Sequence, residues 1–427
     1  MLAIAAVAIC AAILWMARTY TFYYDEWTFI EQSPDWTFVS FFQPHNEHPT
    51  MLLRAFYAVM LHTVGLRSYI PYLVALLVLH VANVLMVFSL VRRRAGDLIA
   101  VGAAALFLVL GAGWDDLLWA FQVGWLGSVA FGLGMLLVLD GKPARWRAPV
   151  GAALVTGSLM CSGVGLAFAV IAGVLLALSP GRRRELLWFV PVAFALAVWY
   201  VALGRFGEHP NPQPTAGNLL LDPGYTLWGL SQSAAAVIGE AGLIGVPLLL
   251  VAAAAVAFSW WRWRDTYILA VAAGLVSFFA VAGLTRAQLG YMQAASSRYM
   301  DVGALLWILL LAEAARYLPW RGRWRPILTA LAFLACFNSA VLLLSFGIAR
   351  TVLMERQVAD FYALAAERGD PCLNPNGAVD LVVMPVETRP ADYYRAVDLY
   401  GDPRAGQPLL DRASYDTGIA NLRKAGC

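Results

Sequence analysis

Charged residues are scarce in this chain of 427 residues. Only 13% of the residues are Asp, Glu, Lys or Arg, and 61% are hydrophobic, whereas charged residues make up about a quarter of an ordinary soluble domain. So little charge could not cover the apolar surface of a chain of this size in water. The composition excludes an ordinary soluble protein and predicts an all-α polytopic membrane protein.

Several familiar motifs are also missing. No P-loop, GxGxxG, HExxH or GxSxG element occurs in a suitable context, so ATP and nicotinamide chemistry are not expected. The net charge of +3 is explained by basic loops between membrane spans, and nucleic-acid binding has no support. Lysine is rare too, because only Lys142 and Lys424 accompany the many arginines, a skew that indicates a bacterial genome of high GC content.

Long apolar runs are present instead, and each can cross roughly 30 Å of hydrocarbon. The first run lacks a basic n-region and an A-x-A site, so we expect a retained span and not a signal peptide. The fifth and sixth runs meet at 161–163 and predict a short helical hairpin. About eleven transmembrane helices are expected in all, at 2–18, 69–91, 97–113, 121–140, 148–161, 163–179, 185–204, 241–260, 265–284, 299–316 and 326–348.

Basic residues fall in alternate loops between these runs. Such a bias places the five basic loops and the N-terminus in the cytoplasm, and the C-terminus outside, in an integral plasma-membrane protein. The basic loops contain Arg92, Arg93, Arg94, Lys142, Arg145, Arg147, Arg182, Arg183, Arg184, Arg262, Arg264, Arg316, Arg321, Arg323 and Arg325.

Two polar stretches lie in the first outer loop, residues 19–68. "YYDEWTF" places Asp25 and Glu26 among aromatic residues, and "PHNEHPT" contains His45, Glu47 and His48. Such groups are costly near a membrane unless they serve a purpose, and acids at the headgroup level can act as bases. An outward-facing base beside a bilayer suits a reaction between a lipid-borne donor and an extracellular acceptor. The alternative is that the two acids only solvate the loop.

These motifs resemble the GT-C glycosyltransferases, particularly the protein-mannosyltransferase-like branch. In that branch an Asp-Glu pair in the first outer loop is followed by His-Pro-Pro, and here the pair is followed by His48, Pro49 and Thr50. The resemblance implies a polyprenyl-phosphate sugar donor, catalysis on the non-cytoplasmic side, Asp25 as the base and Glu26 positioning the acceptor. The chain departs from the branch at Thr50, in its smaller number of spans and in its smaller soluble part.

Further polar residues on the same face are candidates for substrate contacts. Arg298 and the N-terminus of the tenth span predict an anion site for the donor phosphate; the alternative is that Arg298 extends to the lipid headgroups. Arg286, in the same loop, is a second candidate with the same alternative, and Tyr299 follows Arg298. Asp115 and Asp116 face the same side, and a helix cap explains them about as well as a role in catalysis does. Glu208 and His209 lie in a proline-rich loop that could be a lid.

The histidine-rich stretch also suggests a metal site. His45, Glu47 and His48, with Asp25, are good ligands for zinc or manganese. However, the spacing differs from H-E-x-x-H, and prolines on both sides disfavour the helix which that motif needs. We therefore expect these side chains to bind phosphate or sugar hydroxyls, or to order the loop. No organic cofactor is required, and a divalent cation is compatible with the chemistry but not demanded.

The tail, residues 350–427, is more polar than the transmembrane domain at 1–349. Its patterns predict an amphipathic helix over 351–368, a buried strand over 378–386 and a helix over 390–401. We expect a small extracytoplasmic α/β domain. Cys372 and Cys427 are predicted to form a disulfide in an oxidising compartment, and the alternative is two free thiols.

The predicted function is that of an inverting membrane glycosyltransferase. It would move a sugar from a polyprenyl-phosphate carrier to a cell-envelope glycan, lipid or protein, in contact with membrane lipids. One alternative is a transporter or flippase for lipid-linked or polar solutes, which should have charged or broken positions near the membrane centre in paired halves. A second alternative is a structural subunit of an envelope complex.

Overall fold

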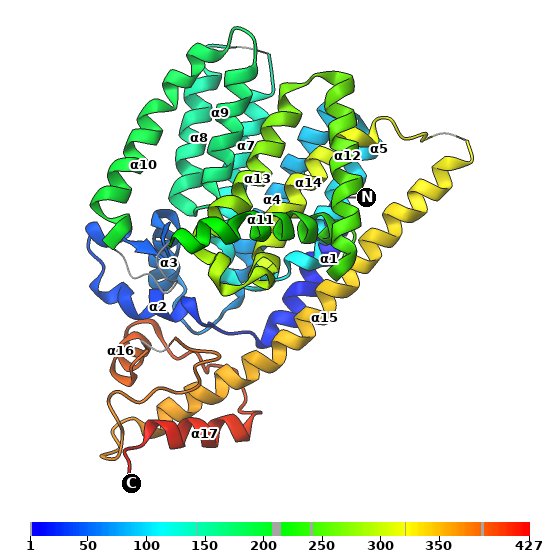
Figure 1. The fold of residues 1–427 in the computed structure, drawn as a ribbon. Helices are drawn as coiled ribbons and strands as arrows, with labels where there is room; N and C mark the ends of the chain where they lie inside the picture. Colours follow the sequence, from blue (N-terminus) through cyan, green and yellow to red (C-terminus); the bar gives the residue numbers. More distant parts are fainter. Residues whose placement is uncertain (1, 143, 207–214, 240–241, 321, 386–387) are drawn as a thin grey trace.

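The computed structural model describes residues 2–142, 144–206, 215–239, 242–320, 322–385 and 388–427, and these are mostly helical (Figure 1). Strands β1 (Pro44–His45) and β2 (His48–Pro49) form a small antiparallel hairpin. The helices are α1 (Leu2–Met16), α2 (Asp25–Gln32), α3 (Met51–Thr63), α4 (Ile70–Ala95), α5 (Asp97–Leu108), α6 (Asp115–Leu118), α7 (Val123–Leu139), α8 (Arg147–Cys161), α9 (Gly165–Leu178), α10 (Val190–Ala202), α11 (Ala216–Ala236), α12 (Gly245–Trp263), α13 (Thr266–Arg286), α14 (Ser297–Ala315), α15 (Trp324–Glu367), α16 (Pro390–Tyr400) and α17 (Arg412–Leu422).

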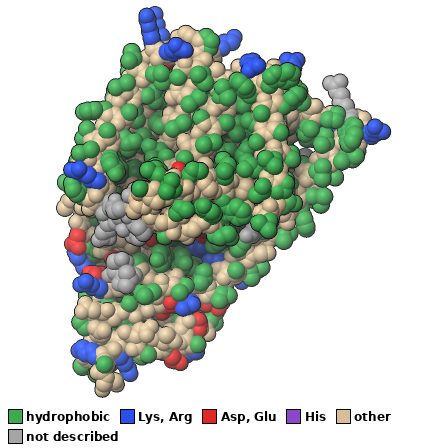
Figure 2. Space-filling model, viewed as in Figure 1, with side chains coloured by type: hydrophobic (Ala, Val, Ile, Leu, Met, Phe, Trp, Pro, Cys, Tyr) green, Lys and Arg blue, Asp and Glu red, His purple; other side chains and the backbone are tan. Residues whose placement is uncertain are grey.

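The helices form a bundle with an apolar surface. Every predicted span coincides with helical structure, and seven helical stretches within the described ranges are long and apolar enough to cross a membrane. Figure 2 shows hydrophobic side chains over the bundle, and charged side chains at its upper end and on the tail. The chain is therefore a helical polytopic membrane protein. The number of spans and the side that faces the cytoplasm stay predictions.

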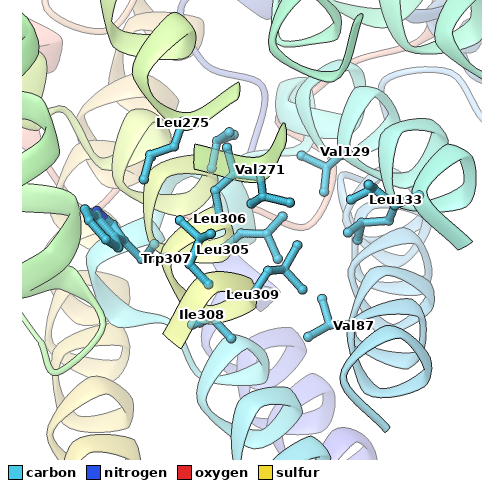
Figure 3. Packing of buried hydrophobic residues seen from close by; sticks show 14 of the residues in the cluster. Val87, Val129, Leu133, Val271, Leu275, Leu305, Leu306, Trp307, Ile308 and Leu309 are labelled. Atoms are coloured by element: carbon cyan, nitrogen blue, oxygen red, sulfur yellow. The ribbon is translucent and has the colours of Figure 1, made fainter. Parts of the chain in front are cut away.

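Aliphatic side chains fill the centre of the bundle. Val87 of α4, Leu133 of α7, Val271 of α13 and Leu305 of α14 are all fully buried in one cluster (Figure 3). Between membrane helices such close packing itself holds the elements together, because lipid tails are as apolar as the side chains. The core thus fixes the helix ends that surround the polar site.

Ion pairs join the helix ends at the basic side of the bundle. Arg94, at the end of α4, donates hydrogen bonds to Asp140, Asp265 and Glu313, and its guanidinium lies over the ring of Tyr267 at 3.8 Å. These partners belong to the ends of α7, α13 and α14. Arg94 therefore ties four helices together at one end.

The helical hairpin predicted around 161–163 is confirmed, because α8 ends at Cys161 and α9 begins at Gly165. Its tip lies against the first outer loop. A Cβ atom on Gly163 would come within 2.5 Å of His48 Nδ1, so only glycine allows this approach.

Helix α11 lies in a segment for which the sequence predicted an outer loop. It begins after Thr215, whose side chain accepts a hydrogen bond from the amide of Asn218, and it contains Pro223. In Figure 1 this helix runs across the bundle and not along it. Because α11 has a polar start and an internal proline, its sequence does not resemble that of a membrane span.

The tail is attached through a single long helix. α15 has 44 residues and unites the predicted span 326–348 with the amphipathic helix predicted over 351–368. The helix predicted over 390–401 is confirmed by α16. The predicted disulfide between Cys372 and Cys427 is confirmed too, with a Cα–Cα distance of 5.8 Å.

The strand predicted over 378–386 is wrong in the part that the structure describes. The carbonyl of Asp380 accepts hydrogen bonds from the amides of Val383 and Met384, and its carboxylate accepts one from the amide of Val382. This local bonding replaces a strand ladder. Apart from an isolated bridge between Leu373 and Arg423, the described part of the tail consists of helices and turns, so the α/β class predicted for it is wrong.

Replacement of Arg94 tests the ion-pair cluster. Arg94→Met should lower the free energy of unfolding by about 3–5 kcal/mol, because it leaves Asp140 and Asp265 without this buried partner, although Glu313 keeps its bond from Arg316. The matched control is Arg93→Met, since Arg93 is exposed and, among the described residues, donates a hydrogen bond to the carbonyl of Leu137 and to no carboxylate. Thermal unfolding in detergent measures the stability of both variants. An equal, small loss of stability in the two variants would contradict the role of Arg94.

Candidate active site

A cavity of about 1220 Å³ opens between the first outer loop, the hairpin tip, the start of α14 and the tail. The tail contributes Leu381 and Pro385. The wall of the cavity contains six of the predicted site residues, which come from segments far apart in the sequence: Asp25, His45, His48, Arg286, Arg298 and Tyr299.

Asp25 begins helix α2 and faces the cavity. The preceding residue, Tyr24, has a positive φ of 48°, which is uncommon for a side chain of this size, and its amide donates to the carbonyl of Val383 in the tail at 3.0 Å. The Asp25 side chain is 14% exposed, with its Oδ1 at 4.0 Å from His45 Nε2. The carboxylate is therefore accessible from the cavity and held beside an imidazole.

Glu26 points the other way. Its carboxylate is fully buried and accepts hydrogen bonds from Tyr57 at 2.6 Å, from Tyr69 at 3.3 Å and from the amide of Tyr23 at 2.8 Å. Burial raises the pKa of Glu26 to about 7, and the hydrogen bonds oppose that rise. The side chain does not reach the cavity, so the expected contact of Glu26 with an acceptor is wrong.

The histidine-rich stretch forms the β1–β2 hairpin on the cavity wall. Burial, followed by the charges of Arg286 and Arg298, holds the pKa of His48 well below its usual range, so this imidazole is neutral. Glu47 accepts a hydrogen bond from Arg286 at 3.2 Å. The hairpin therefore supplies the neutral imidazole of His48 and an anchor for one of the cavity arginines.

The start of α14 places Arg298 and Tyr299 on the cavity wall as well. The carboxylates whose charges act on the Arg298 guanidinium are those of Asp25, Asp115 and Asp116. The ring of Tyr299 stacks on Trp125 at 5.9 Å. A cation and a carboxylate thus share one cavity.

Asp115 and Asp116 lie behind this wall and do not line the cavity. Asp115 accepts a hydrogen bond from Arg350 of α15 at 3.4 Å. Asp116 is fully buried, and neither of its carboxylate oxygens has a hydrogen-bond partner among the described residues; the same holds for Asp301. Burial, then the charge of Asp301, raises the pKa of Asp116 well above its usual range. Asp115 and Asp116 therefore lie outside the cavity lining, and their predicted contacts with substrate stay predictions.

The proposed metal ligands do not converge. Among the residues that the structure describes, no three His, Cys, Asp or Glu side chains form a group that could hold a metal ion. Asp25 and His45 lie 4.0 Å apart, Glu47 pairs with Arg286, and His48 lies against Gly163. The predicted lid residues Glu208 and His209 lie outside the described residues.

Some cavity residues escaped the sequence analysis. Arg54 of α3 is 3% exposed, lines the cavity, and places its guanidinium over Phe29 at 4.8 Å. A lone arginine inside an apolar helix is costly, and that signal could have revealed it. Gln122, Trp125 and Gln293 also line the cavity, but nothing in their local sequence marks them.

The arrangement can bind an anionic ligand next to an apolar one. Arg286 and Arg298 supply positive charge, and Leu203 and Phe206 line the same cavity. Asp25 supplies an acceptor for a proton. A lipid phosphate that departs as a leaving group, and a nucleophile that must lose a proton, match these features.

Comparisons with known proteins address the fold. No protein-family model and no curated protein matches the sequence. Among solved structures, the chain is similar to ArnT from Cupriavidus metallidurans bound to undecaprenyl phosphate, with 14% identity and a TM-score of 0.56 over 98% of this chain and 87% of that one. The chain shares the fold of ArnT. This likeness concerns the fold and does not single out the protein-mannosyltransferase-like branch expected from the sequence.

The buried carboxyl of Glu26 should make stability depend on pH. Its pKa rises from 4.5 to about 7 on folding, so its contribution is fully present below the unfolded value and is lost as the pH rises through about 7. The side chain of Glu26→Gln stays neutral at every pH. The free energy of unfolding of this variant minus that of wild type should therefore increase by up to about 3 kcal/mol from pH ~5 to pH ~8.

Thermal unfolding across this pH range measures the effect. The control is Glu355→Gln, a partly buried position on α15. A difference between Glu26→Gln and wild type that does not change with pH would contradict the burial of a titrating carboxyl.

Proposed function

We propose that this protein is a membrane glycosyltransferase of GT-C type. It transfers a sugar from a polyprenyl-phosphate carrier to a hydroxyl group on a cell-envelope glycan, lipid or protein, on the outer face of the membrane. The observation that carries the proposal is the single cavity in which Asp25 lies with Arg286, Arg298 and apolar side chains. The shared fold with ArnT, which has undecaprenyl phosphate bound in its structure, supports a carrier of this class.

The chemistry requires a base and an anion site. In this mechanism the acceptor oxygen bonds to the anomeric carbon while the bond from that carbon to the carrier phosphate breaks, with inversion at the carbon. Asp25 takes the proton of the acceptor hydroxyl, and the polyprenyl phosphate leaves with the electron pair. Arg298 and Arg286 offset the charge that develops on the leaving phosphate. The donor carries its own leaving group, so the proposal invokes no organic cofactor.

Burial supports this assignment of roles. Water is partly excluded around the Arg298 guanidinium, and a charge-assisted contact to phosphate is stronger in such surroundings. His45 lies beside Asp25 and is a candidate hydrogen-bond partner for an acceptor hydroxyl. Glu26, being buried behind Asp25, has a positioning role and does not contact substrate.

Removal of the base is the first test. Asp25→Asn keeps the shape of the side chain and should lower sugar transfer by about 10²- to 10⁴-fold, the usual contribution of a general base. Radiolabelled transfer from polyprenyl-phosphate sugars in proteoliposomes measures it. Asp97→Asn, at an exposed position on α5, should transfer sugar at the wild-type rate. Activity above about a tenth of wild type in folded Asp25→Asn would remove Asp25 from this role.

Donor binding is the second test. Arg298→Ala should raise the donor concentration needed for half-maximal transfer by at least about tenfold, because a charge-assisted phosphate contact is lost. Arg298→Lys should restore only part of the affinity for the donor, since lysine lacks the two-pronged guanidinium. The control is Arg412→Ala, at an exposed position on α17. An unchanged donor requirement in Arg298→Ala would leave the arginine with no part in phosphate binding.

A further inference from the structure

A second cavity lies between the first outer loop and the tail. Its volume is about 960 Å³, within the roughly 300–1,000 Å³ of small-ligand sites. It is lined by the segment 33–41 that follows α2, by α3, and by α16 of the tail, and it is open to the outside. Figure 1 shows α16 next to α2, on the side of α2 away from the bundle. We call this cavity the tail groove.

Aromatic rings form much of the tail groove. Trp36, Phe41, Tyr394 and Tyr400 line it, and each is only partly buried. The hydroxyl groups of the two tyrosines are held by the protein, since Tyr394 donates to the carbonyl of Leu364 at 2.7 Å and Tyr400 accepts from Ser33 at 3.0 Å. Arg368 lies over the Tyr394 ring at 5.1 Å and Arg54 over the Trp36 ring at 5.5 Å, so the groove meets partly covered aromatic rings whose remaining surface is apolar.

Two ion pairs add fixed polar groups. Arg395 donates two hydrogen bonds to Asp35, both at 2.7 Å, and Asp398 accepts two from Arg368. Exposed pairs of this kind contribute little to stability, but their two-pronged geometry holds hydrogen-bonding groups in place. Their charges cancel, so the groove favours a neutral ligand over an anion.

The tail groove and the active-site cavity share a wall. Arg54 and Gln32 line the active-site cavity, and Trp36 lines the groove. The Arg54 guanidinium lies over the Trp36 ring at 5.5 Å and donates to Gln32 at 3.5 Å. A chain bound in the groove therefore lies next to the cavity that contains Asp25.

We propose that the tail groove binds a neutral oligosaccharide, the extended part of a glycan acceptor. Sugar rings present flat faces of C–H groups that pack on aromatic rings, and equatorial hydroxyls that bond to planar groups such as those of Arg395 and Asp398. This inference rests on the proposed function and selects the glycan among its acceptor classes. The groove holds the chain while its end reaches the catalytic cavity.

Binding of neutral linear hexasaccharides tests the proposal. Cellohexaose, maltohexaose and mannohexaose are each titrated into the full-length protein in detergent by calorimetry. At least one should bind, and Ala391→Trp, which fills the groove from an exposed position on α16, should weaken binding at least tenfold. Ala420→Trp, at an exposed position on α17 outside the groove, should bind as wild type does.

Two further arms separate this proposal from the proposed function. Asp25→Asn should bind the hexasaccharide as wild type does while failing to transfer sugar. Ala391→Trp should keep transfer to a short acceptor that cannot span both cavities. No binding by any of the three hexasaccharides, or equal binding by Ala391→Trp and wild type, overturns the tail groove as a glycan site. Neither result bears on sugar transfer at Asp25.

Discussion

The burial of one carboxyl, that of Glu26, determines how the site is built. Donors from Tyr57 of α3 and from Tyr69, just before α4, converge on it, so α2 cannot rotate without leaving a buried acid unbonded. Successive residues on a helix point about 100° apart. With Glu26 directed into the protein, Asp25 is directed into the cavity. The two adjacent acids of the motif therefore differ in their surroundings: Glu26 fixes the orientation of the helix, and Asp25 faces the cavity.

The tail depends on the same constraint. The backbone turn at Tyr24 that precedes α2 is bonded to the carbonyl of Val383, and the segment around Val383 also supplies Leu381 and Pro385 to the cavity. The cavity is thus closed on one side by a part of the chain about 350 positions away. Its shape requires the outer loop and the tail to be folded together.

Hydropathy alone predicted much of the fold. Each apolar run became a helix, because in lipid the backbone must satisfy its own hydrogen bonds. The errors occurred where local chemistry opposed the average composition. The polar start and Pro223 of α11 hid a helix, and the bonds made by Asp380 turned a β-branched stretch into a turn. The sequence predicted one span ending at 348 and a separate helix beginning at 351, whereas α15 is continuous through both.

The candidate site was predictable only in part. Motif residues such as Asp25, His48 and Arg298 were found because charge is rare in this chain, and rarity makes each polar residue informative. The sequence does not contain the direction in which a side chain points. Nothing in "DE" distinguishes Asp25, which faces the cavity, from Glu26, which is buried. Partners such as Arg54 and Arg350 meet the site through contacts between distant segments, which a local pattern does not contain.

The long helix α15 links the site to the bilayer itself. At about 1.5 Å per residue, its 44 residues extend for roughly 66 Å, about twice the thickness of the hydrocarbon layer. A helix adapts to a thinner or thicker bilayer by changing its tilt, and an uninterrupted one carries that change along its whole length. Arg350 lies on this helix and the tail follows its C-terminal end. The apolar part of the chain and the part that closes the cavity are therefore continuous through one helix.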